Sequence, residues 1–163
     1  MKDKITFHYR TPDMIPPNIL IQVRELVDRG AAVGTSYVRD NLRDAFLIGY
    51  ALDEEMRVVG TVTHKTPKEI YRESIEQATG LSLSGYLERG YTSIEPAYRK
   101  CNIADFLIKG LIERSKGQRI YTTIRMDNLP ALKLTRKNKM ILAATFVNQR
   151  TGNEIGVFVN TPE

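Results

Sequence analysis

Five stretches of the chain are rich in hydrophobic, β-branched and aromatic residues and are bounded by polar and turn residues, and this pattern predicts β-strands. Near the N-terminus, for example, Ile5, Phe7 and Tyr9 alternate with polar residues. The five stretches are 4–10, 45–65, 86–96, 119–126 and 140–159. Two of them contain turn residues near their centres, at Asp53–Glu55 and Gly152–Asn153, so each is expected to form an antiparallel hairpin.

The stretches between them have the composition or the spacing of helices. Ile103, Leu107 and Leu111, for example, recur every four positions and would line one face of a helix. The expected helices span residues 18–30, 36–45, 67–80, 103–116 and 128–138. Glycines follow or close two of them, and Asn128 is a suitable N-cap for the last.

The order of these elements predicts the fold. It is β-α-α-β-β-α-β-α-β-α-β-β, which indicates an α/β chain of the α+β type. We expect a mixed, mostly antiparallel sheet of about seven strands with helices on both faces, and parallel strands on either side of the helix 103–116. With 163 residues and no repeat or linker, the chain is expected to be a single domain over residues 1–163.

Composition excludes several classes of protein. No run of eighteen apolar residues occurs, so neither a membrane-spanning helix nor a membrane partner is expected. The first ten residues lack the apolar segment of a secretory signal, and Cys101 is the only cysteine, so a cytoplasmic location is expected. His8 and His64 show no metal-binding spacing, so no metal is expected.

The net charge of +5 is unevenly distributed. Residues 97–151 contain 12 lysines and arginines against 3 acidic residues, a balance of +9, and the remaining residues have a balance of −4. The second half therefore favours an anionic partner, either a small molecule with several phosphates or a nucleic acid. A solvated basic surface is the alternative.

One strand-to-helix junction has the features of a phosphate site. The N-terminus of a helix presents unpaired N–H groups and the positive end of the helix dipole. Asn102 is a good N-cap, and Asp105 would complete a capping-box-like pair. Arg99 and Lys100 add two cations, and Asn tolerates a positive φ in place of glycine. The alternative is an ordinary turn with a surface arginine.

The same residues resemble a motif of the GNAT superfamily of acyl-CoA-dependent N-acyltransferases. The phosphate loop of that family is Arg/Gln-x-x-Gly-x-Gly/Ala, and the stretch 99–104 is Arg-Lys-Cys-Asn-Ile-Ala. It keeps the arginine and the final alanine, and Asn102 stands at the middle glycine. The stretch 94–99, Ile-Glu-Pro-Ala-Tyr-Arg, is similar to the Val-x-Pro-x-Tyr-Arg that precedes the loop in the family.

A second block is similar to the family pattern Asn-x-x-Ala-x-x-Leu-Tyr-x-Lys-x-Gly-Phe. The matching residues are Asn128, Ala131, Leu134 and Lys137. The departures are Thr135 at the tyrosine, Lys139 at the glycine and Met140 at the phenylalanine. The resemblance covers most of residues 44–160, and each block falls on the expected element.

This resemblance implies a site for acetyl-CoA as co-substrate. Backbone N–H groups of the stretch 100–104 would hold the pyrophosphate of coenzyme A, and the strand before the loop would pair with the pantetheine arm. Asn128 would hydrogen-bond the cofactor. The implied cofactor-binding residues are Thr92, Ser93, Ile94, Arg99, Lys100, Cys101, Asn102, Ile103, Ala104 and Asn128.

Acylation of an amine requires a base, and Glu88 is the candidate. A substrate ammonium must lose a proton before it attacks a thioester, and a carboxylate can accept that proton. By period two, Glu88, Gly90, Thr92 and Ile94 would share one face of their strand. The position of Glu88 also resembles that of the base in histone-acetylating members of the family. The alternative is an exposed carboxylate at the end of the strand.

The usual proton donor of the family for the leaving thiolate, a tyrosine, is absent from its place in this sequence. Thr135 replaces the tyrosine of the family, and an alcohol is far less acidic than a phenol. Tyr91 and Tyr121 lie on neighbouring strands and could serve instead, although a core position is the alternative for both. On the helix 67–80, Glu76 and two other glutamates could attract a cationic acceptor, or could simply face solvent.

The expected function is therefore transfer of an acetyl group from acetyl-CoA to a primary amine by direct attack in a ternary complex. The expected partners are acyl-CoA and a small-molecule or peptide amine. Two alternatives remain: an inactive GNAT-fold module that binds acyl-CoA, and an acyltransferase that acts on charged tRNA. Nucleic acid is not the expected partner, and a homodimer is left open.

Overall fold

The computed structural model describes residues 4–30 and 37–160. The strands are β1 (Thr6–Arg10), β2 (Leu47–Leu52), β3 (Val58–Lys65), β4 (Leu87–Ile94), β5 (Ile120–Arg125), β6 (Met140–Val147) and β7 (Glu154–Asn160). The helices are α1 (Pro17–Gly30), α2 (Val38–Arg43), α3 (Glu69–Thr79), α4 (Ile103–Arg114) and α5 (Leu129–Lys137), and two short 3-10 turns are η1 (Pro12–Met14) and η2 (Pro96–Tyr98). The order is the predicted one. Ser36, the first residue of the second expected helix, lies outside the described residues.

The seven strands form a mixed sheet in the order β1-β2-β3-β4-β5-β7-β6. The pairs β1–β2, β2–β3, β5–β7 and β6–β7 are antiparallel, and β4–β5 is parallel, as predicted for the step across α4. The predicted fold class is thereby confirmed. None of the helices in the described residues is both long and apolar enough to cross a membrane.

The chain divides into two compact units, and each is described by itself. Unit 1 comprises Met1–Thr66 and Gly90–Ser115, and unit 2 comprises Pro67–Arg89 and Lys116–Glu163. The boundary crosses β4, so Leu87 to Arg89 belong to unit 2 and the later residues of the strand belong to unit 1. That the whole chain acts as one domain stays a prediction.

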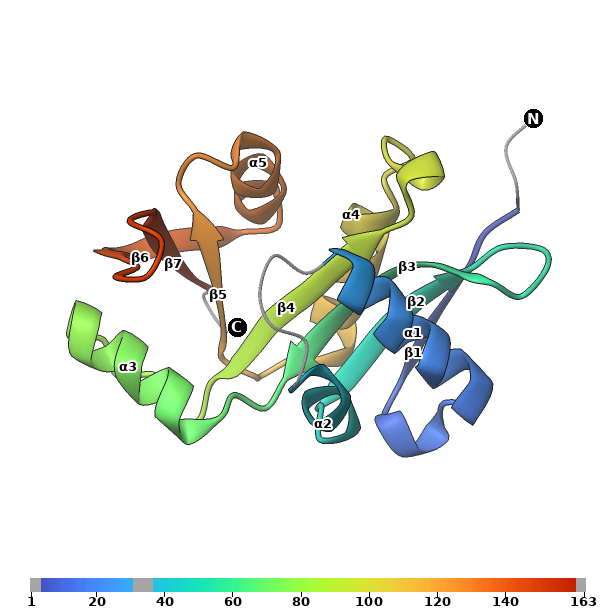
Figure 1. Ribbon diagram of the computed structural model, residues 1–163, viewed down its shortest axis with the longest axis horizontal. Coiled ribbons are helices and arrows are strands. Elements are labelled where there is room, and N and C mark those ends of the chain that lie inside the picture. Colours follow the sequence, from blue (N-terminus) through green and yellow to red (C-terminus); the bar gives the residue numbers. More distant parts are fainter. Residues whose placement is uncertain (1–3, 31–36, 161–163) are drawn as a thin grey trace. The chain divides into compact units, whose positions relative to one another are not determined.

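In unit 1 the strands are covered by α1 and α2 on one face and by α4 on the other (Figure 1). Ile48 and Tyr50, two positions apart on β2, pack into one cluster with Val23 of α1. On the other face, α4 approaches β3 so closely that a Cβ at Gly60 would lie 2.7 Å from Ile103 Cγ2. Glycine at this position therefore fixes the distance between β3 and the first turn of α4.

In unit 2 two helices cover opposite faces of the strands. Ile75 of α3 packs with Tyr121 of β5 and Val157 of β7. On the other face, Leu132 of α5 packs with Ile120, the neighbour of Tyr121 on β5. Side chains of adjacent strand residues point to opposite faces, so the neighbours Ile120 and Tyr121 each pack against a different helix. α3 ends at Thr79, next to the glycine that the sequence predicted as its stop, and Gly80 with a φ of 76° is a left-handed C-cap.

Candidate functional site

The loop 99–102 connects η2 to α4 and is exposed. Two of its residues have left-handed backbones, Lys100 with φ 69° and Asn102 with φ 59°. Asparagine is among the residues that adopt this conformation most readily, whereas it is uncommon for lysine. The position at which the GNAT motif has a glycine is therefore left-handed in this chain, and asparagine occupies it.

The expected capping box at the start of α4 is wrong. Asn102 is the N-cap residue, but its side chain makes no hydrogen bond to the helix. A capping side chain needs an extended backbone at the N-cap, and ψ at Asn102 is 21° in the left-handed region. Asp105 also does not cap the helix, because its carboxylate binds the Lys109 ammonium one turn later. The N-terminus of α4 is therefore left open.

Within the described residues, no backbone or side-chain acceptor receives a hydrogen bond from the N–H groups of Lys100, Cys101, Asn102, Ile103 and Ala104. A left-handed residue followed by helical ones directs successive N–H groups into one concavity, which suits an anion. The helix dipole adds positive potential at the same place. The exposed side chains of Arg99 and Lys100 add two formal charges. The arrangement suits a phosphate.

A left-handed residue within β4 contradicts the prediction that Gly90 and Ile94 share a face. A Cβ at Gly90 would meet the Lys65 side chain, and the Lys65 ammonium lies over the ring of Tyr91, 4.1 Å from its centroid. Ile94 instead points to Gly60 and α4, on the opposite face. The cause is the left-handed backbone of Tyr91, with φ 52°, which interrupts the period-two alternation.

Tyr91 itself occupies a defined position. Its hydroxyl oxygen accepts a hydrogen bond of 2.7 Å from the Asn41 side chain of α2, and its ring packs against the core under α1. Because the oxygen accepts this bond, the phenolic O–H can still donate one. Further along β4, Thr92 is exposed, and Ser93 faces α1 so closely that a Cβ at Gly30 would lie 2.8 Å from its Oγ.

Three other predicted site residues belong to unit 2. Glu88 is only 5% exposed and is the partner of Tyr121 in the parallel ladder, so the alternative of an exposed carboxylate is wrong. Thr135 is buried in α5. Asn128 caps α5 as predicted, since its Oδ1 accepts a hydrogen bond of 3.3 Å from the Ala131 N–H.

Tyr121 is completely buried, and its hydroxyl has no hydrogen-bond partner in the described residues. Burial raises the pKa of Tyr121 far above its ordinary value, and the charge of Glu88 raises it further. This phenol therefore remains protonated at every practical pH and is a poorer acid than an exposed tyrosine. The core position weighed from the sequence is confirmed.

Comparison with known proteins supports the fold. No family model matches the sequence, and no curated protein matches it. Among solved structures, NAA60 of Arabidopsis thaliana in complex with acetyl-CoA aligns with a TM-score of 0.68 and 18% identity, over 94% of this chain and 98% of that one. The chain has the GNAT fold.

Two bacterial structures agree with this assignment. An acetyltransferase of the GNAT family from Streptococcus agalactiae aligns with a TM-score of 0.69 and 14% identity, over 99% of both chains. The ribosomal-protein-S18-alanine N-acetyltransferase of Escherichia coli aligns with a TM-score of 0.68 and 8% identity, over 95% of this chain and 93% of that one. At such identities the shared feature is the GNAT fold, and the chemistry depends on the residues of this chain.

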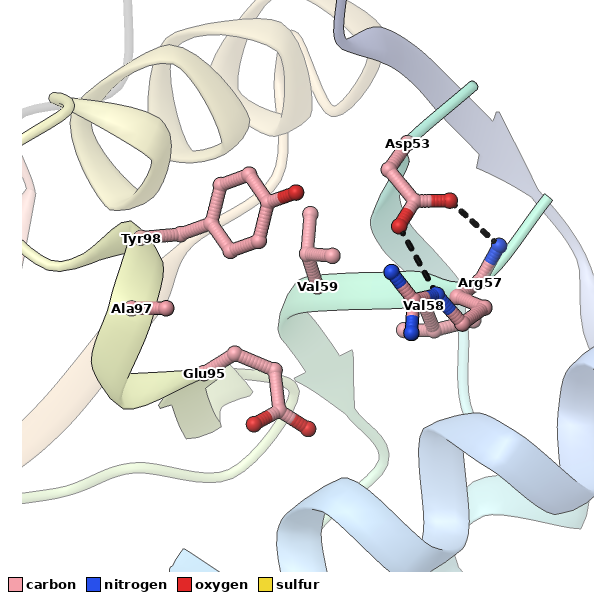
Figure 2. Close-up of a pocket in the computed structure, with 7 residues that line it drawn as sticks. All are labelled: Asp53, Arg57, Val58, Val59, Glu95, Ala97 and Tyr98. Atoms are coloured by element: carbon pink, nitrogen blue, oxygen red, sulfur yellow. Dashed lines mark hydrogen bonds and ion pairs between the residues drawn. The ribbon is translucent and has the colours of Figure 1, made fainter. Parts of the chain in front are cut away.

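A cavity of about 260 Å³ lies beside the loop in unit 1 (Figure 2). It is lined by Asp53, Arg57, Val58, Val59, Glu95, Ala97 and Tyr98. Two carboxylates face it, and its arginine is already hydrogen-bonded to Asp53 at 3.0 Å. A phosphate would meet repulsion from both carboxylates, so in this GNAT-fold chain the open N-terminus of α4 is the better anion site.

The sequence reading missed two arginines of unit 2. Arg89 is 5% exposed, and burial lowers its pKa to about 10, so it still carries a positive charge at neutral pH. Arg72 lies on α3 with its side chain 17% exposed, near Glu76. The sequence did not indicate this, because α3 carries two isoleucines, Ile70 and Ile75, and only Ile75 is buried. The sequence around Arg89 also gave no indication that this arginine is buried.

Proposed function

We propose that this protein transfers an acetyl group from acetyl-CoA to an amine. One observation carries the proposal: the uncapped N-terminus of α4, where the N–H groups from Lys100 to Ala104 have no acceptor among the described residues. Such N–H groups bind a diphosphate well, and the GNAT fold places a strand directly before them. The local excess of basic residues is compatible with the several phosphates of coenzyme A.

The residues at this site fit the cofactor. The N–H groups of the loop would bind the pyrophosphate, with Arg99 and Lys100 contributing charge. The backbone of Thr92–Ile94 would pair with the pantetheine amides in the manner of an added strand. Asn128 would donate from its Nδ2, because its Oδ1 is taken by the cap of α5.

The reaction needs one base and one acid. The acceptor ammonium gives a proton to Glu88, directly or through a water, and the neutral nitrogen attacks the thioester carbonyl carbon. The N–C bond forms, the C–S bond breaks, and the sulfur leaves as a thiolate. The nitrogen is then positively charged, and it loses a second proton to become the amide; this proton balances the one that the thiolate takes up. Tyr91 is our candidate to protonate that thiolate, because its O–H remains able to donate. Thr135 is a weaker candidate, since it is an alcohol buried in α5.

The experiment is acetyl-CoA-dependent release of free thiol with a panel of amines. The Escherichia coli neighbour is named for an alanine of a ribosomal protein, so peptide N-termini belong in the panel beside small amines. We expect thiol release that requires both acetyl-CoA and an amine. No release with any amine, together with no binding of acetyl-CoA, would refute the proposal.

The burial of Thr135 favours one second candidate, a GNAT-fold module that binds acyl-CoA without turnover. In that case the acid of the family is lost and nothing replaces it. Calorimetry that detects acetyl-CoA binding, combined with no thiol release across the panel, would support this module over the enzyme.

A further inference from the structure

A charged pair on α3 faces the interior of unit 2. Arg72 and Glu76 flank Ile75 on one stripe of the helix, and Ile75 packs against Tyr121. Their side chains are 17% and 22% exposed, whereas Glu69 and Glu73 of the same helix are exposed to solvent. The alternative prediction, that the glutamates of this helix face solvent, therefore holds for Glu69 and Glu73 but not for Glu76.

The Arg72 guanidinium has unused hydrogen-bonding capacity. Its Nη1 is 3.7 Å from Glu76 Oε1, an ion pair too long for a hydrogen bond, and the described residues show no hydrogen bond from its guanidinium. Its positive charge acts to lower the pKa of Tyr121, so the two groups are near each other. Glu76 has a second task, because its Oε2 accepts a hydrogen bond of 2.7 Å from the Leu83 N–H. Five N–H donors of a mostly buried arginine are thus left for a ligand.

A second donor lies on the same side of the strands. The Tyr121 hydroxyl is fully buried and has no partner in the described residues, and buried hydroxyls in native proteins nearly always have one. Tyr121 is also the ladder partner of Glu88, the proposed base. The interior face of α3 therefore combines two donors for an anion with one carboxylate for a cation.

We propose that Arg72 binds a carboxylate of the acceptor, so that the acceptor is an amine with a carboxylate a few atoms from its nitrogen, such as a free amino acid. The planar guanidinium matches a carboxylate with two parallel hydrogen bonds. The ammonium of the same molecule would face Glu88. A doubly charged phosphate fits less well, because Glu76 and Glu88 would both repel it. The inference rests on the proposed function.

The test compares amino acids with their carboxamides as acceptors. α-, β- and γ-amino acids differ in the number of atoms between the amine nitrogen and the carboxylate, and together they sample this distance. Each amino acid is compared with its own carboxamide, which lacks only the carboxylate charge. We expect the wild type to prefer at least one carboxylate over its amide. In Arg72→Gln the KM for that acceptor should rise by about ten- to a hundred-fold, while the KM for the amide stays the same. Arg72→Lys should recover part of the preference.

Two further variants sharpen the test. Glu76→Gln keeps an acceptor for the Leu83 N–H but removes the competing charge, so it should lower the KM for the carboxylate. Arg150→Gln removes an exposed arginine of the β6–β7 loop and should change nothing. Equal use of acid and amide by the wild type, or an unchanged preference in Arg72→Gln, would overturn the proposal.

Binding of the amino acid alone separates this inference from the acetyl transfer itself. A thermal shift of the free protein by the preferred amino acid, absent with its amide and lost in Arg72→Gln, needs no acetyl-CoA. If thiol release occurs only with amines that lack a carboxylate, the acyltransferase stands and the carboxylate site fails. If the thermal shift occurs without thiol release, the carboxylate site stands and the acyltransferase fails.

Discussion

Three left-handed residues determine the geometry of the proposed cofactor site. Lys100 and Asn102 turn the loop so that its N–H groups stay open, and Tyr91 interrupts the alternation of side chains along β4. In an L-residue this conformation costs about 1–2 kcal/mol relative to the right-handed region. The surrounding structure must offset that cost, which is why such residues concentrate at functional sites.

Only part of this could be read from the sequence. Asn102 signals a left-handed turn, but it signals an N-cap equally well, and the two require different backbones. Lys100 and Tyr91 carry no local signal at all, since neither lysine nor tyrosine favours a left-handed backbone. Tyr91 is held by the side chains of Asn41 and Lys65, which are distant in sequence.

At the scale of single residues, the first prediction concerns Glu88. If it accepts the proton of the acceptor ammonium, Glu88→Gln should lower turnover on the order of a hundred-fold or more. The loss should be greatest at low pH, where little of the amine is already neutral. Turnover measured across pH for the wild type, for Glu88→Gln and for the exposed control Glu73→Gln tests this. A parallel pH profile in Glu88→Gln would exclude Glu88 from the role.

At the scale of elements, the contact between β3 and α4 positions the loop. Ile103 is the first helical residue of α4, and it lies against Gly60 with no room for a methyl group. Gly60→Ala should therefore destabilise the protein by about 1–3 kcal/mol through overpacking and should weaken acetyl-CoA binding as α4 shifts. Gly49→Ala is the matched control, because its new Cβ would make contacts of about 3.4 Å. Equal stability of the two variants in urea denaturation would contradict the prediction.

The turn of the β2–β3 hairpin gives a prediction about pH. Burial acts to raise the pKa of Asp53, but hydrogen bonds from the Arg57 N–H, the Arg57 guanidinium and the Glu55 N–H outweigh it, so the pKa lies below 3.8. A carboxyl group with a lowered pKa in the folded state stabilises the protein above the pKa of the unfolded chain. That stability is lost as the pH falls through the folded-state value.

Asp53→Asn keeps the shape and removes the charge. At pH 7 we expect it to lower the free energy of unfolding by about 1–2 kcal/mol, since hydrogen bonds to a charged group are replaced by neutral ones. The difference from the wild type should shrink as the pH falls below 3.8. Urea denaturation at a series of pH values measures it, and a difference that persists undiminished in acid would contradict the account.

Element order and type were predictable because they depend on local periodicity, and both hairpins and the parallel β4–β5 step are as expected. The four-residue spacing also predicted that Ile103, Leu107 and Leu111 lie on the buried face of α4. Arg72 was missed for a different reason: on a charged helix the sequence does not say which polar stripe faces inward. That choice depends on the strands under α3, where Ile75 meets Tyr121.

At the scale of the whole molecule, the uneven charge predicts how binding responds to salt. Acetyl-CoA carries several phosphate charges, and its partner loop lies in the basic second half of the sequence. We expect acetyl-CoA affinity to fall several-fold between 50 and 500 mM salt because exposed charges are screened. RNA should bind weakly, with little dependence on salt. A steep fall of tight RNA binding with salt would instead favour the charged-tRNA alternative.

The most direct test of the central claim is calorimetric titration of acetyl-CoA into variants of Asn102. Asn102→Gly should bind as tightly as the wild type or more tightly, because glycine adopts the left-handed backbone without cost. Asn102→Val should bind about ten-fold more weakly, because a β-branched residue disfavours the left-handed backbone that this position requires. Lys139→Val places the same strain at a left-handed residue between α5 and β6 and should leave affinity unchanged. Undiminished affinity in Asn102→Val, or no heat with the wild type, would contradict the assignment of this loop.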